Sequence, residues 1–164
     1  MANSSIPKRE QVPEEYTWNL KDIFESDEAW AEENEALKAL PEKLRAYQGH
    51  LGESAENLLD FFRFEDEAGV RLEKLMGYAS CKSDQDTGNA FYQDMRGKAI
   101  GTAVAASSAA AFATPEIMAI PEDKLNLFYV AQPGLEEYRR SIYQIRRRAA
   151  HILSPEAVSY THLT

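Results

Sequence analysis

The chain has 164 residues, of which 44% are hydrophobic and 27% charged, as is ordinary for a soluble globular protein with its own core. Its net charge of −9 arises in residues 1–67, where 17 acidic and 7 basic residues argue against nucleic acid as a partner of that half. A single cysteine excludes an internal disulfide, and the longest uncharged run, residues 99–115, is too short and too weakly apolar to span a membrane.

The first predicted element is a long amphipathic helix that begins after Ser26, which can cap it. Before it, residues 1–11 are polar and lack the apolar core of a signal peptide, so we expect a flexible tail and a cytoplasmic protein. Pro41 interrupts the helix, so we expect there either a kink or a junction of two helices. Gly49 and Gly52 end the segment. The apolar face of the helix comprises Trp30, Leu37, Leu40, Leu44 and Tyr47.

Ser54 is predicted to cap the next helix, which begins with an apolar run. The acidic residues 65–67 either continue this helix or open another one. Cys81 lies near the end of the helical pattern. Because the sequence nearby supplies no base, we interpret Cys81 as a small buried helix residue rather than a nucleophile. The stripe expected to be buried comprises Ala68, Leu72, Leu75, Met76 and Ala79.

The loop at residues 83–89 is rich in the oxygen-bearing side chains that bind calcium, but its spacing is wrong. If Asp84 is taken as the first ligand, Gly88 stands where a fifth-position oxygen is needed. Met95 then stands where the loop needs a bidentate glutamate. We therefore interpret the loop as a turn, with Asn89 capping the helix that follows.

The helix after Asn89 is rich in alanine, with eight alanines among residues 99–113. Alanine favours helix, and small side chains let neighbouring helices approach closely, so we expect this helix to be central in a bundle. Residues 114–116 (Thr-Pro-Glu) indicate the start of a short helix with proline at its first position. Residues 121–122 (Pro-Glu) start a longer one, and residues 133–134 (Pro-Gly) break the pattern.

The last clear helix is predicted over residues 135–149, where apolar residues recur at steps of three and four. Its stripe comprises Leu135, Tyr138, Ile142, Ile145 and Ala149. Its arginines are Arg139, Arg140, Arg146, Arg147 and Arg148. Arginines at a helix end suit its negative pole, whereas a nucleic-acid patch would need interleaved aromatic residues, and contact with an acidic surface elsewhere is a third alternative. A further short helix is expected after Ser154.

The sequence contains no motif that would carry catalysis. Zinc peptidases of the H-E-x-x-H type need two histidines one helical turn apart with a glutamate between them. The histidines of this chain, His50, His151 and His162, form no such pair. Glycine-rich phosphate loops, Cys-x-x-Cys and nucleophile elbows are missing as well. We therefore predict no catalytic, cofactor-binding or metal-ligating residue in this chain.

Several motifs nevertheless follow one another in the order found in a known family. They include VPEEYTWNL, SDEAW and PGLEEY, and in full they occupy residues 12–20, 26–30, 36–41, 51–56, 78–80, 114–117, 121–125 and 133–138. Over residues 9–157 the chain thereby resembles the N-terminal portion of the oligoendopeptidase F family of thimet-oligopeptidase-like zinc metallopeptidases. None of these motifs is catalytic, so the resemblance indicates ancestry.

The resemblance implies an all-α fold in which residues 12–157 form a helical N-terminal domain of a larger peptidase. In this family such helices form one wall of a deep channel, and zinc bound by H-E-x-x-H in the C-terminal half acts on short peptides. The implied partners are short peptides and the C-terminal catalytic domain of the same chain, with neither nucleic acid nor membrane. The fragment alone is expected to bind no zinc and to be inactive. Residues 158–164 depart from the family and are expected to be a non-native or truncated tail.

From the residues alone, a second function stays open, namely a free-standing helical-bundle adaptor for protein interactions. Its amphipathic helices and uneven charge would serve helix-in-groove recognition. Such an adaptor should be a stable monomer or dimer that unfolds cooperatively, and molten or aggregating behaviour in a thermal melt would contradict it.

Overall fold

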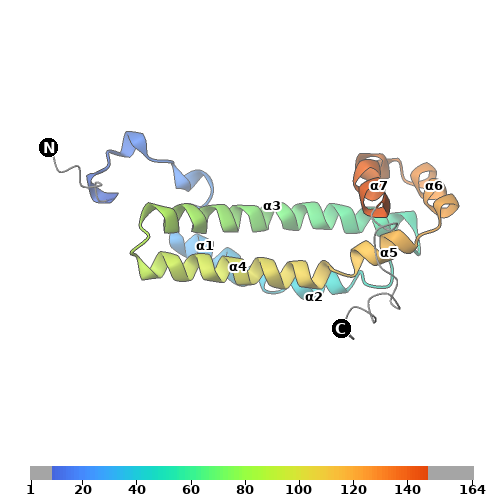
Figure 1. The fold of residues 1–164 in the computed structure, drawn as a ribbon, viewed down its shortest axis with the longest axis horizontal. Helices are drawn as coiled ribbons and strands as arrows, with labels where there is room; N and C mark the ends of the chain where they lie inside the picture. Colours follow the sequence, from blue (N-terminus) through green and yellow to red (C-terminus); the bar gives the residue numbers. More distant parts are fainter. Residues whose placement is uncertain (1–8, 148–164) are drawn as a thin grey trace, which may run out of the picture. The chain divides into compact units, whose positions relative to one another are not determined.

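The computed structural model describes residues 9–147, and every regular element in that range is a helix (Figure 1). The α-helices are α1 (Asp27–Leu37), α2 (Leu40–Arg45), α3 (Ala55–Gln85), α4 (Ala90–Ala110), α5 (Ala113–Ala119), α6 (Glu122–Ala131) and α7 (Arg139–Arg147). The 3-10 helices are η1 (Arg9–Gln11), η2 (Glu14–Tyr16), η3 (Leu20–Asp22) and η4 (Pro133–Tyr138). The expected all-α fold is confirmed.

The chain divides into two compact units. Unit 1 comprises Met1–Leu44 and Asp66–Ala109, and unit 2 comprises Arg45–Glu65 and Ala110–Thr164. Helix α3 runs through the acidic residues 65–67 without a break. The division between the units falls between residues 65 and 66, so α3 contributes to both. Of the two alternatives that the sequence left open at this patch, the continuous helix is the one observed.

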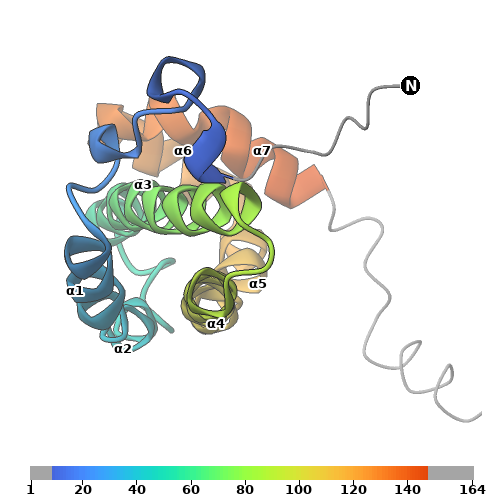
Figure 2. The same ribbon diagram turned by 90° about the vertical axis from the view of Figure 1, so that its left-hand side faces the viewer.

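In unit 1, α1 and α4 run along the part of α3 that belongs to this unit (Figures 1 and 2). Trp30 is 3% exposed, and its indole Nε1 donates a hydrogen bond of 2.9 Å to the carbonyl of Leu75. A tryptophan placed in this way buries a large apolar area while its polar atom stays satisfied, so it anchors α1 on α3. The buried residues of this unit include Trp30, Leu37, Leu75, Ala79, Met95, Ala99 and Ala106.

Both serine caps expected from the sequence are present. The Oγ of Ser26 accepts a hydrogen bond from the Ala29 N–H at 3.3 Å, which starts α1. The Oγ of Ser54 accepts one from the Asn57 N–H at 3.1 Å, which starts α3. Each bond satisfies a backbone donor that the first turn of a helix leaves without an intrahelical partner.

Pro41 marks a junction between two helices rather than a kink. Helix α1 ends at Leu37 and α2 begins at Leu40, so the proline lies in the first turn of α2. The backbone N–H that proline lacks would have had no intrahelical acceptor in that turn, so the proline costs no hydrogen bond there.

In unit 2, the core surrounds Phe61, whose side chain is fully buried. Its ring lies 5.6 Å from that of Tyr47, 5.9 Å from that of Phe62 and 5.8 Å from that of Phe112, measured between centroids. Phe62 in turn stacks on Tyr138 at 4.7 Å. These aromatic contacts join four segments that are far apart in the sequence, so this cluster organises the unit.

Two glycines of unit 2 are required by their surroundings. Gly49 has φ of +88°, a backbone conformation that favours glycine, and its N–H donates a 2.6 Å hydrogen bond to a carboxylate oxygen of Glu116. At Gly134, a Cβ atom would lie 3.1 Å from Leu59 Cδ2 and 3.2 Å from Arg63 Nη2. The turn into η4 can therefore approach α3 closely because residue 134 has no side chain.

Two predicted helix starts were wrong. Helix α5 begins at Ala113, so Pro115 is its third residue rather than its first. Proline is tolerated there because none of the first N–H groups of a helix has an intrahelical acceptor. The last helix begins as the 3-10 helix η4, and its α-helical part starts only at Arg139. The Pro133-Gly134 pair begins this segment with the tighter turn, which is common at helix ends.

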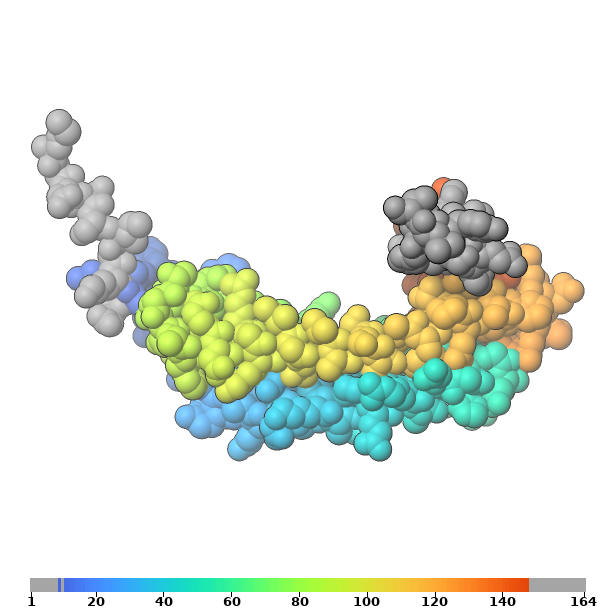
Figure 3. Space-filling view, turned by 60° about the horizontal axis from the view of Figure 1, so that its bottom comes forward, coloured from blue at the N-terminus to red at the C-terminus, as the bar shows by residue number. Residues whose placement is uncertain are grey.

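The expectation that the alanine-rich helix is central was also wrong for the described residues. In α4 the buried side chains are Met95, Ala99, Ala106 and Ala109, all on one side. Phe91, Ile100 and Val104 are 57%, 45% and 61% exposed. In the space-filling view the outer surface of α4, drawn yellow-green to yellow, is open along its length (Figure 3). Within residues 9–147 the small side chains bring α4 close to other helices on one side only.

Some expectations fall outside the described range. They concern most of the flexible tail at residues 1–11, the end of the last helix at Arg148 and Ala149, the helix after Ser154, and the tail at residues 158–164. Among the described residues, no single helix is long and apolar enough to cross a membrane. The stretch Ala90–Ala119 and the helix Glu122–Ala131 would reach that length and composition only together, as a bent pair.

Candidate functional site

A polar cluster, formed by Asp27, Tyr78, Lys82 and Tyr92, lies where α1 begins beside the end of α3. The phenol of Tyr78 donates a 2.7 Å hydrogen bond to Oδ1 of Asp27, and Lys82 Nζ lies 3.0 Å from the same oxygen. The Lys82 ammonium also lies 5.3 Å from the ring centre of Tyr78 and 5.2 Å from that of Tyr92. The phenol of Tyr78 and the ammonium group of Lys82 thus contact the same carboxylate oxygen. The ammonium group also lies near two aromatic rings, which favour its positive charge.

Burial and hydrogen bonding determine which members of the cluster are protonated. Burial, followed by the hydrogen bond to Asp27, raises the pKa of Tyr78 to about 12. Burial alone would lower the pKa of Lys82, but the hydrogen bond to Asp27 and the neighbouring charges raise it overall. At neutral pH both groups donate and neither is free to act as a base or nucleophile. The cluster therefore acts as a clamp between α1 and α3.

The pH dependence of stability should report this clamp. An unfolded tyrosine has a pKa of about 10, whereas the pKa of folded Tyr78 is about 12. The protonated Tyr78 phenol therefore stabilises the fold fully below the tyrosine pKa of the unfolded chain. This stabilisation is lost as pH rises through the pKa of folded Tyr78. Ultraviolet titration should show a late tyrosine phase, because the pKa of Tyr78 is raised to about 12. Tyr78→Phe should remove this late phase, and a titration unchanged by that substitution would contradict the assignment.

A second feature of unit 1 is a cleft of about 520 Å³ between α1 and α4. Its lining is mainly apolar or small and includes Trp30, Leu37 and Gly101. Asn34, which is 7% exposed, accepts a 2.7 Å hydrogen bond from the Thr102 hydroxyl there. This bond pairs the buried amide of Asn34 in α1 with the half-buried hydroxyl of Thr102 in α4, so it fixes the register of the two helices and offers no reactive group.

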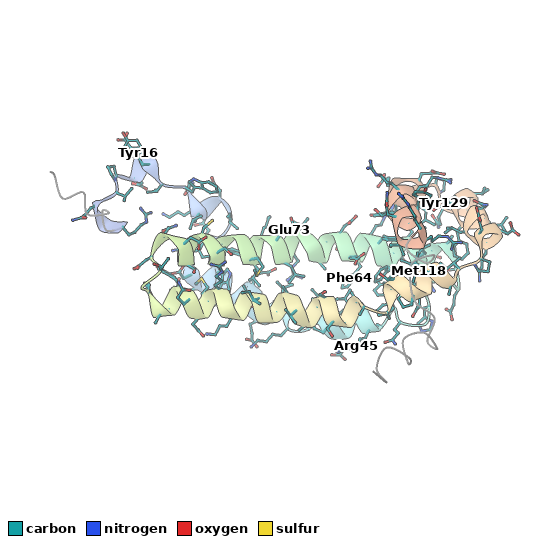
Figure 4. The ribbon with its side chains drawn as sticks, viewed as in Figure 1. Tyr16, Arg45, Phe64, Glu73, Met118 and Tyr129 are labelled. Atoms are coloured by element: carbon teal, nitrogen blue, oxygen red, sulfur yellow. The ribbon has the colours of Figure 1, made fainter. Side chains whose placement is uncertain are left out.

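A groove of about 660 Å³ in unit 2 runs between α6 and α7 (the α6–α7 groove). Tyr129, which Figure 4 labels on α6, lies under the guanidinium of Arg139 at 3.9 Å from its ring centre. Arg139 also donates two hydrogen bonds of 2.6 Å to the carboxylate of Glu136. Arg146 donates to the carbonyls of Ile117 and Ile120. Arg146 thus serves the C-terminal end of α5 rather than that of its own helix.

The residues that could have carried metal or thiol chemistry do not form a site in the described range. His50 is exposed, and its Nδ1 lies 2.9 Å from Oε2 of Glu53. Within residues 9–147 there is no group of three or more His, Cys, Asp or Glu that could hold a metal ion. Cys81 is partly exposed, so the expectation of a buried cysteine was wrong. It lines a pocket with Tyr16 and Trp18 of the N-terminal segment, and Tyr16 points away from the helices (Figure 4).

Sequence analysis missed the polar cluster because its members are distant in the chain. Asp27 could be assigned only a favourable place in the first turn of a helix. Its partners Tyr78 and Lys82 lie 51 and 55 residues further on. The available signal was their spacing of four residues, which places an aromatic ring and an ammonium group on one face of α3.

Comparison with known proteins gives consistent matches. A family model described as Oligopeptidase F matches residues 116–157. Oligopeptidase PepF of Bacillus subtilis (strain 168) is 42% identical over 151 residues, which are 92% of this chain and 22% of that protein. Group B oligopeptidase PepB of Streptococcus agalactiae is 33% identical over 89% of this chain and 24% of that protein. The chain thus spans about a quarter of the length of these relatives.

Solved structures agree in fold. The crystal structure of oligoendopeptidase-F from Enterococcus faecium superposes with a TM-score of 0.68 and 31% identity, covering 80% of this chain and 26% of that one. The crystal structure of a putative peptidase from Chlamydophila abortus superposes with a TM-score of 0.79 over 93% of this chain and 26% of that one. At 18% identity, the second match supports the helical fold alone.

Proposed function

Because the chain belongs to the oligoendopeptidase F family, we propose that it forms the N-terminal helical part of a zinc endopeptidase that hydrolyses short peptides in the cytoplasm. The observation that carries this proposal is the 42% identity with Oligopeptidase PepF over 92% of the chain, which makes up 22% of that relative. The chain matches a peptidase over most of its own length, yet the matched sequence contains no catalytic motif. A non-catalytic part of the enzyme would give such a match.

Within that parent enzyme we assign residues 12–157 to one helical domain that forms part of the wall of the peptide channel. Long helices such as α3 and α4, each clamped to α1, are rigid enough to border a channel. Their contribution would be to restrict access to short, unfolded peptides and to exclude folded proteins. This role needs shape and rigidity rather than reactive side chains, and the polar cluster and the Asn34–Thr102 hydrogen bond supply rigidity.

The described residues do not fit a zinc site. Zinc is bound by three or four nitrogen, sulfur or oxygen ligands in tetrahedral geometry. His50 has a single carboxylate neighbour, Glu53, and residues 9–147 contain no group of three ligand-type side chains. We therefore assign zinc to the remainder of the parent protein, and no step of hydrolysis to the side chains described here.

The parent protein provides the test. It should hydrolyse short peptides, lose that activity by several orders of magnitude when a chelator removes its metal, and recover it with added zinc. The 164-residue chain should show neither zinc uptake nor hydrolysis in the same assays. A coding sequence that continues beyond this segment without H-E-x-x-H would refute the proposal, and so would peptide hydrolysis that is unaffected by chelation.

A further inference from the structure

The cleft between α1 and α4 (the α1–α4 cleft) contains a buried polar group that its protein neighbours satisfy only in part. Asn34 belongs to the lining of the cleft and is 7% exposed. Its amide oxygen Oδ1 accepts the hydrogen bond from the Thr102 hydroxyl. Its amide nitrogen Nδ2, in contrast, donates to no other residue within residues 9–147. In the same range every fully enclosed side-chain nitrogen or oxygen has a partner, so Nδ2 is open to the cleft.

The free end of the Asn34 amide defines what a ligand must offer. An amide nitrogen carries two N–H donors and accepts no hydrogen bond. A polar group in a mostly buried side chain needs a partner, which is either water or a ligand atom. A ligand in the α1–α4 cleft must therefore present an oxygen acceptor to Nδ2.

The walls of the cleft expose apolar surface that a ligand can cover. Ala31 of α1 and Gly101 and Ala105 of α4 line the cleft, and all three are exposed. A Cβ atom at Gly101 would meet nothing within 4 Å, so the space beside this part of α4 is open. The volume of about 520 Å³ is within the range of sites that bind small ligands. An apolar group that enters the cleft would remove these walls from water.

The charges at the rim favour a neutral ligand over an anion. Lys38 and Lys98 lie at the rim, one on each side. The ammonium group of Lys38 lies 2.5 Å from a carboxylate oxygen of Glu35, and that of Lys98 lies 2.6 Å from one of Asp94. Each positive charge is thus offset by a neighbouring carboxylate, so a carboxylate ligand would gain little by binding here.

We propose that the α1–α4 cleft binds an uncharged, apolar peptide segment. A main-chain carbonyl of the peptide accepts a hydrogen bond from Nδ2 of Asn34, and an apolar side chain lies beside Gly101 against Ala31 and Ala105. A peptide places a neutral carbonyl close to each side chain, which is the combination that the cleft requires. The inference rests on the proposed function for the source of the peptide, and it specifies that function: this part of the enzyme would hold apolar substrates without reacting with them.

The first test is an NMR titration of the 164-residue chain, labelled with nitrogen-15. The ligand is N-acetyl-leucyl-leucine amide, a blocked peptide without charge. The side-chain amide signals of Asn34 should shift saturably, because Nδ2 gains an acceptor. N-acetyl-glycyl-glycine amide should bind about tenfold more weakly or less, since it has the same carbonyls but no apolar side chain. The free acid of the leucine peptide should bind no more tightly than the amide.

A matched pair of glycine substitutions tests the position of the ligand. Gly101→Leu should abolish the shift, because the new side chain occupies the cleft. Gly97→Leu makes the same change one turn earlier in α4, at a position outside the lining, and should leave binding unchanged. At both glycines a Cβ meets nothing within 4 Å, and leucine favours helix more than glycine does, so both variants should fold. Circular dichroism verifies this.

Asn34→Asp tests the hydrogen bond itself. It keeps an oxygen that can accept from Thr102 but replaces the N–H donors with an acceptor that repels a carbonyl. Binding should weaken about tenfold or more. The backbone signals of Ala31 and Ala105 report binding in this variant.

Three results with the chain would overturn the inference. The first is no saturable shift with the leucine peptide, which would leave water as the partner of Nδ2. The second is equal loss of binding in Gly97→Leu and Gly101→Leu. The third is tighter binding of the free acid, which would indicate an anion site.

The parent enzyme separates a substrate from an internal segment. There Gly101→Leu should raise KM for an apolar peptide with kcat unchanged, as expected when binding alone is lost. An unchanged KM, although the 164-residue chain binds the peptide, would assign the cleft to the remainder of the polypeptide and overturn the inference. If the parent hydrolyses peptides while the chain binds none, this inference fails and the proposed function stands.

Discussion

Replacing Phe61 with alanine is expected to lower the free energy of unfolding of the chain by about 3–5 kcal/mol. The ring is fully buried, and it contacts the rings of Tyr47, Phe62 and Phe112. These neighbours come from separate segments, and Phe62 is also stacked on Tyr138, so they cannot all move into the space that the ring would leave. The lost apolar burial and the remaining cavity both destabilise the fold. Urea unfolding followed by circular dichroism measures the change.

The matched control is Phe91→Ala in α4, the same chemical change at a residue that is 57% exposed. Because an exposed ring loses little burial, we expect a cost below about 1 kcal/mol. Losses of equal size at Phe61 and Phe91 would contradict the core assigned to unit 2. A loss at Phe91 alone would contradict the exposure of the outer face of α4.

Asp27→Asn is expected to destabilise the chain by about 2–3 kcal/mol, the second largest effect. The substitution keeps the size of the side chain but removes the charge that Lys82 approaches at 3.0 Å. It also replaces a charged acceptor of the Tyr78 hydroxyl with a neutral one. The side chains of Asp27 and Lys82 are only 24% and 21% exposed, so water compensates the lost partner incompletely. Thermal and urea unfolding should both report the loss.

Two comparisons separate this effect from a general change of charge. Asp60→Asn makes the same change at an exposed position of α3 and should alter stability by less than about 0.5 kcal/mol. In a double-mutant cycle, Asp27→Asn and Tyr78→Phe should couple by more than about 0.5 kcal/mol, because each removes part of the same hydrogen bond. Additive effects of the two substitutions would show that the bond does not contribute to stability.

Local patterns predicted that the chain is helical and where α1, α3, α4 and α6 begin. The caps Ser26 and Ser54 were recognised because an N-cap needs only a side-chain oxygen near the start of an apolar pattern. Trp30, Leu37 and Leu75 were correctly predicted to be buried, because apolar residues that recur at helical spacing lie on one face of a helix. The sequence left open whether Pro41 kinks one helix or lies at the junction of two, because proline occurs in both places. It also left open whether residues 65–67 continue a helix or start one, because acidic residues are compatible with both.

The sequence by itself determined that this protein is helical, where most helices begin, and which family it resembles, because caps, periodicity and motif order are properties of neighbouring residues. Only the tertiary structure decided that Asp27 meets Tyr78 and Lys82, that α4 is open on one side, and that two arginines of α7 remain on a groove edge while Arg139 and Arg146 are engaged. Such contacts join residues tens of positions apart, and many pairings of the same amphipathic helices satisfy the same periodicity. The choice among them depends on how side chains of specific shape and charge pack together.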